Sequence, residues 1–102
     1  MAEIVYEHTV AGKAVTLKSR LPGREAHLLP KLLMDYAGDT DTVVEMGRIA
    51  IAAWEFGGNP NDKRAYADLD VFDELLPLGK VLVEYITARM QAASEAQEAL
   101  KN

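Results

Sequence analysis

Residues 4–18 read IVYEHTVAGKAVTLK, with β-branched and aromatic side chains alternating with polar ones on both sides of Ala11-Gly12. This alternation around a short turn containing glycine predicts a β-hairpin. A turn centred on Ala11-Gly12 places His8 opposite Val15. One face of the hairpin is then apolar, and it carries Ile4, Tyr6, His8, Val15 and Leu17.

The rest of the chain must supply a cover for that face, because an isolated hairpin is only marginally stable in water. Residues 24–37 place leucines at helical spacing and predict the first helix. Pro30 is expected to kink or restart this helix, since proline removes a backbone donor and crowds the preceding turn. Gly38 is expected to end it.

Residues 39–42 read DTDT and form a favourable helix start, because their side chains can accept hydrogen bonds from free amide groups. Thr42 and Glu45 match a capping box. A second helix is expected to run from here to Gly57-Gly58. Its apolar stripe would consist of Val43, Met46, Gly47, Ala50 and Trp54.

A loop is expected at residues 59–62, followed by a helical region in which Pro77 separates a short helix from a long one. Residues 91–102 are rich in Ala, Gln and Glu and predict a polar, lightly packed helical tail. The sequence therefore predicts a single α+β domain over residues 1–102. A hairpin at about 4–18 packs on three to four α-helices at about 22–90, and the tail follows.

The composition excludes several classes of protein. There are 102 residues and no cysteine, so disulfide frameworks and thiolate metal sites are ruled out, and one packed core must provide the stability. Neither a secretory signal nor a run of about 18 apolar residues is evident, so we expect a cytoplasmic protein that does not enter membranes. The net charge of −5 argues against nucleic-acid binding.

Charge is unevenly distributed along the chain. Residues 13–31 hold five Lys or Arg residues against Glu25 alone, whereas residues 35–84 are predominantly acidic. This asymmetry could steer a partner or a second copy of the chain, although two solvated faces would also explain it.

No arrangement of residues in the sequence indicates catalysis. His8 and His27 lack the convergent partners that a nucleophile and its base need, so we predict a protein that is not an enzyme and needs no cofactor. Carboxylates at residues 68–74 could bind a hard cation, but their spacing matches no calcium loop and helix capping explains Asp70.

A set of large apolar residues around the loop between the second and third predicted helices is the candidate partner-binding surface. Aromatic side chains are favoured anchors of protein interfaces, although burial in the core would account for them too. The candidate residues are Trp54, Phe56, Tyr66, Phe72 and Leu76.

Several segments, taken in order, resemble the small tail assembly chaperones of long-tailed bacteriophages and prophages. Together they cover most of residues 13–86, although no single motif among them is specific. The segments are VTLKSRL (15–21), GREAHLL (23–29), AWE (53–55), NPND (59–62) and LDVFDELLPL (69–78).

The resemblance implies a non-enzymatic protein in the cytoplasm of a bacterial host. Such chaperones bind the long, helical tape measure protein, keep it soluble and help to recruit the major tail protein. Covering an apolar helical stripe in a groove would suppress aggregation. The alternative is a small structural protein of a tail or virion that assembles with itself into a homo-oligomer.

Overall fold

The computed structural model describes residues 3–101 and the side chains of residues 3–97. Strands β1 (Glu7–Val10) and β2 (Lys13–Leu17) form the predicted hairpin, and His8 pairs with Val15 as expected. Ala11 and Gly12 both have positive φ, 52° and 77°, as the two central residues of a type I′ turn require. The predicted turn and register are therefore confirmed.

The sheet has a third strand that the sequence analysis assigned to a helix. The predicted second helix ends at Ala50, and β3 (Ile51–Trp54) pairs antiparallel with β2 in the order β1-β2-β3. The amide of Lys18 donates to the carbonyl of Ala50 at 2.8 Å, which ties the junction to the hairpin. The prediction of a helix reaching Gly57-Gly58 was wrong because backbone pairing with β2 outweighs a helical pattern that a short apolar run also satisfies.

The helical half begins with two short helices, α1 (Gly23–Ala26) and α2 (Leu29–Asp35). Pro30 lies in the first turn of α2, where no amide donor is needed, so the predicted restart is confirmed. Helix α3 (Thr40–Ala50) is capped by Asp39, whose carboxylate accepts from the amide of Thr42 at 3.0 Å. The capping box predicted at Thr42 and Glu45 is therefore wrong, because the helix begins two residues before Thr42.

The last third of the chain forms the longest element. A 3₁₀ turn, η1 (Lys63–Tyr66), follows the predicted loop, and the π-helical segment η2 (Val71–Leu75) continues directly into α4 (Leu76–Lys101). Asp70 caps η2 by accepting from the amides of Phe72 and Asp73. The change of helix type falls beside Pro77, the predicted boundary, and the predicted helical tail is the end of α4.

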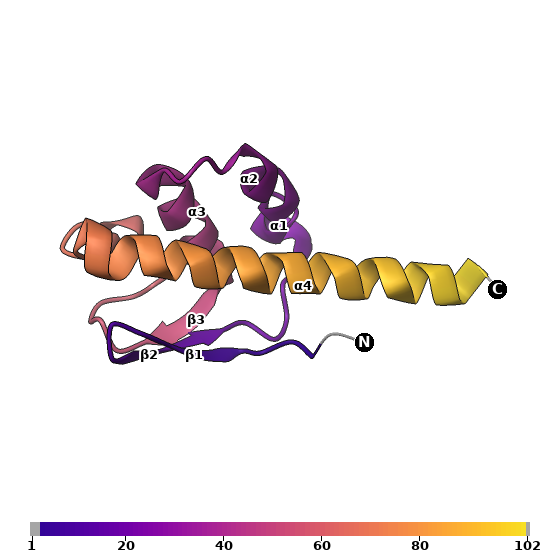
Figure 1. The fold of residues 1–102 in the computed structure, drawn as a ribbon, viewed down its shortest axis with the longest axis horizontal. Helices are drawn as coiled ribbons and strands as arrows, with labels where there is room; N and C mark the ends of the chain where they lie inside the picture. The colour runs from indigo at the N-terminus through magenta and orange to yellow at the C-terminus, as the bar shows by residue number, and fades with distance from the viewer. Residues whose placement is uncertain (1–2, 102) are drawn as a thin grey trace.

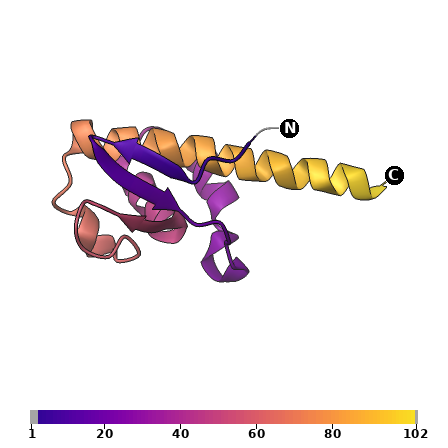
Figure 2. The same ribbon diagram turned by 90° about the horizontal axis from the view of Figure 1, so that it is seen from below.

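The fold is α+β, as predicted, and the sheet and helices α1–α3 form two layers on either side of α4 (Figure 1). Figure 1 shows α4 crossing the molecule with the sheet on one side and α1–α3 on the other, and Figure 2 shows the sheet from its outer side. Side chains from both layers build the core, including Val15 and Leu17 of the sheet and Val43, Met46, Leu78 and Leu82 of the helices. None of the helices described is long and apolar enough to cross a membrane.

The C-terminal turns of α4 extend beyond every other element in both views, and the molecule measures 49 Å along its longest axis against 24 and 23 Å across. We call residues 91–101 of α4 the arm. All but one of the arm residues from Gln91 to Gln97 are exposed, so this part of the arm depends on helical propensity and hardly at all on packing.

Candidate functional site

The structure brings together three of the five predicted interface residues. The Trp54 ring lies 5.4 Å from the ring of Phe56 and 4.7 Å from that of Tyr66, measured between centroids. Tyr66 is buried, and its hydroxyl donates to the carbonyl of Pro60 at 2.7 Å. Trp54 and Phe56 are half-buried against the core, so this cluster closes the end of the sheet and exposes little aromatic surface.

The other two predicted residues lie on different elements. Phe72, on η2, is 77% exposed, and Leu76, at the start of α4, is half-buried. Of the five, Phe72 alone presents a large apolar side chain freely to solvent.

The two histidines each bond to a nearby backbone carbonyl. His8 Nε2 lies 2.9 Å from the oxygen of Val5, and His27 Nδ1 lies 2.7 Å from that of Gly23. Over the residues that the structure describes, no three His, Asp or Glu side chains gather in a way that could hold a metal ion.

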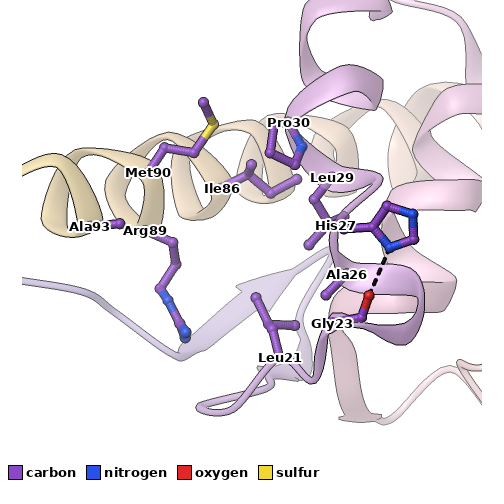
Figure 3. A pocket seen from close by; sticks show the side chains of 10 residues that line it. All are labelled: Leu21, Gly23, Ala26, His27, Leu29, Pro30, Ile86, Arg89, Met90 and Ala93. Carbon is purple, nitrogen blue, oxygen red and sulfur yellow. Dashed lines mark hydrogen bonds between the residues drawn. The ribbon is translucent and has the colours of Figure 1, made fainter. Parts of the chain in front are cut away.

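An apolar groove lies between α4 and the α1–α2 region, away from the aromatic cluster. Its volume is about 310 Å³, and Figure 3 shows the side chains that line it. We call it the α4 groove. Its lining consists of Leu21, Gly23, Ala26, His27, Leu29, Pro30, Ile86, Arg89, Met90 and Ala93.

Two side chains of α4 hold the chain between β2 and α1 beside the α4 groove. The hydroxyl of Tyr85 donates to the carbonyl of Lys18, and Arg89 Nη1 donates to that of Ser19 at 3.0 Å. Burial raises the pKa of the Tyr85 hydroxyl. Beyond these hydrogen bonds, α4 continues while α1 and α2 turn away from it, and the space between them stays open.

Lining residues differ in depth across the α4 groove. Leu29 and Ile86 line it from the core and are 3% and 2% exposed, whereas Met90 lies at its outer edge and is 41% exposed. A guest helix could therefore place apolar side chains on a rigid floor and beside a flexible thioether, which adapts to irregular shapes. The lining is mainly apolar, with His27 and Arg89 as its polar side chains, and it suits the binding of an apolar surface.

Exposed basic residues lie beside the lining of the α4 groove in the chain, and we call them its basic border. Arg20, Arg24 and Lys31 are each next in sequence to a lining residue and exposed. The neighbouring carboxylate, Glu25, is already paired with Arg48 at 2.6 Å. Arg48 also donates to Glu45 at 3.0 Å, and these two bonds raise the pKa of Arg48.

Sequence reasoning did not identify the α4 groove. Ile86 and Met90 fall on the apolar face of the predicted long helix, and such a face predicts burial without saying which part stays uncovered. The available signal was that this apolar face continues to Met90 while the residues after it turn polar.

No protein-family model matches the chain, and comparisons with curated proteins and with solved structures find no significant match.

Proposed function

We propose that this chain is a non-enzymatic protein-binding protein that acts as a tail assembly chaperone of a long-tailed phage or prophage. In this role the α4 groove holds a helical segment of the tape measure protein, and the bound complex helps to recruit the major tail protein. The observation that carries the proposal is the open apolar groove beside a helix that projects from the domain.

The size and lining of the α4 groove fit helix-in-groove recognition. An amphipathic helix presents apolar anchors at positions i, i+3, i+4 and i+7, and it needs an apolar trough between two walls. Met90 and Ala93 of α4 form one wall and Leu21 with Pro30 contributes to the other. The resemblance in sequence favours a tape measure protein as the owner of that helix, and the role would be performed in the cytoplasm of the bacterial host.

A chaperone role follows from the same contacts. A long amphipathic helix without its final partners aggregates through its exposed stripe, and a chaperone that covers the stripe keeps it soluble. The binding must also be reversible, which suits a groove of this modest volume better than a large obligate interface.

The test is coexpression of the chain with a tape measure protein encoded beside it, followed by light scattering on the soluble fraction. The proposal predicts a soluble complex of the two proteins. Ala93→Glu, which places a charge in the apolar lining, should abolish complex formation. Ala96→Glu is the matched control, because Ala96 is exposed on the same helix and does not line the α4 groove. Equal solubility of the partner with and without the chain would refute the proposal.

Self-assembly into a structural oligomer is the second candidate, favoured by the exposed Phe72 beside acidic side chains and by the basic border of the α4 groove. A contact of that kind between copies would weaken with salt. Light scattering of the chain alone at low and high salt distinguishes the two candidates, since the chaperone proposal predicts a salt-independent mass.

A further inference from the structure

We infer that the partner of the α4 groove is an amphipathic helix whose apolar stripe is flanked by acidic side chains. The inference rests on the proposed function in that it takes a helix as the guest. It adds the charge of that guest, which the apolar lining by itself leaves open.

The border of the α4 groove has the opposite sign to the protein as a whole. The chain carries a net charge of −5, yet residues 20–31, which supply six of the ten lining residues, hold Arg20, Arg24 and Lys31 against Glu25 alone. The single acid, Glu25, is bonded to Arg48 and so does not neutralise Arg24 beside it. An acidic protein therefore presents a local basic border at its apolar groove.

Helix α4 adds a positive charge to the same border, and two of its acidic residues lie away from the groove. Arg89 lines the α4 groove, and within the described residues its hydrogen bonds use Nη1 alone, so the remaining guanidinium donors are open to a guest. Glu84 and Glu95 are exposed and do not line it. At about 100° per residue, each lies roughly opposite the lining stripe of α4.

These charges select among helices with the same apolar stripe. Each exposed pair across the border contributes little, but several together favour acidic flanks, oppose basic ones and speed the encounter. The preference should weaken as salt rises, because the border is exposed. The apolar contacts would hold the guest, and the border would decide which guest is held.

The experiment uses three synthetic helical peptides that share one apolar stripe and length and carry Glu, Gln or Lys at the flanking positions. Their affinity for the full chain is measured by fluorescence anisotropy at low and high salt. We expect the Glu peptide to bind roughly tenfold more tightly than the Gln peptide at low salt, and the Lys peptide to bind most weakly. High salt should reduce the differences in affinity between the three peptides.

A double variant, Arg24→Glu with Lys31→Glu, should remove or invert this order while the Gln peptide keeps its affinity. The matched control is Lys63→Glu with Lys80→Glu, which makes the same change in net charge at exposed residues that do not line the α4 groove. This control should keep the order of the wild type.

The possible failures are distinguishable. Equal binding of all three peptides would overturn the inference on charge and leave the proposed function standing. Binding of none of them would overturn both. Self-association of the chain that prevents the Glu peptide from binding would also overturn the inference, and it would favour the structural oligomer.

Discussion

The two ends of α4 are stabilised in different ways although they belong to one continuous helix. From Leu76 to Ile86 the helix packs against both layers, and Leu78 and Leu82 are completely buried. From Gln91 to Gln97 it has little or nothing packed on it, and its residues are mainly small or polar. The α4 groove lies where the packed part of α4 ends and the exposed part begins, at Arg89, Met90 and Ala93.

This difference explains why an apolar groove can persist on a stable domain. The packed part of α4 fixes the helix axis, so the helix extends as a rigid wall beyond the elements that cover it. A wall that needs no further packing can leave one side open to a guest. Variants that act on one part of α4 and not on the other test this division directly.

The largest loss of stability is expected from a substitution in the packed part of α4. Leu82→Ala removes a side chain with no solvent exposure and should lower the free energy of unfolding by about 2–5 kcal/mol, since the cavity it leaves adds to the lost apolar transfer. Urea denaturation followed by circular dichroism measures the change. A loss below that of an ordinary surface substitution would mean that this part of α4 is not central to the core.

The next largest loss of stability is expected at Gly79, where α4 approaches its neighbours closely. A Cβ at Gly79 would lie 2.7 Å from Cγ2 of Val43 and 2.9 Å from the hydroxyl oxygen of Tyr36. Gly79→Ala should therefore destabilise by about 1–3 kcal/mol, because forced overpacking outweighs the gain in helix propensity. Gly23→Ala is the control, since a Cβ there meets nothing within 4 Å. Equal melting temperatures of the two variants would contradict the prediction.

A smaller effect is expected at Tyr66, which packs beneath α3. Burial raises the pKa of its phenol above the ordinary value of 10. A raised pKa in the folded state gives stability that is complete below pH 10 and is lost as the pH rises further. Tyr66→Phe should cost about 1 kcal/mol at neutral pH through the lost bond to Pro60, and it should make the alkaline loss shallower. Urea midpoints measured from neutral to alkaline pH test this, and an unchanged alkaline slope would exclude Tyr66 as its source.

Local patterns predicted the parts of the fold that depend on neighbours in sequence. The hairpin register follows from alternation around Ala11-Gly12, and the break at Pro30 follows from proline chemistry. Strand β3 could not be predicted in this way, because its pairing with β2 joins residues far apart in the chain, such as Val15 and Trp54. Periodicity alone cannot tell a short apolar strand from a further helical turn.

The candidate site was harder to predict for a related reason. The composition favoured aromatic residues as the candidate interface. In the structure Tyr66 is buried in the core, whereas Phe72 is exposed. The α4 groove depends instead on which part of an apolar helix face the other elements fail to cover. That is decided by where α1 and α2 turn away, and so by tertiary packing that no single segment encodes.

The smallest effect on overall stability is expected in the arm. Ala96→Pro removes a backbone donor and crowds the preceding turn, which costs about 3 kcal/mol within a helix interior. The arm can escape that cost by unfolding on its own, because Ala96 and its neighbours pack on nothing that the core needs. The urea midpoint should therefore stay close to that of the wild type.

Hydrogen exchange would show where the change occurs. Amides of residues 91–101 should lose protection in Ala96→Pro, while those of residues 78–86 should keep it. A fall in the urea midpoint as large as that of Leu82→Ala would mean that α4 unfolds as one unit and that its two parts are not independent. If the two parts are independent, Ala96→Pro also measures how much the arm contributes to binding a guest helix. Any loss of affinity in that variant would then occur without loss of the fold.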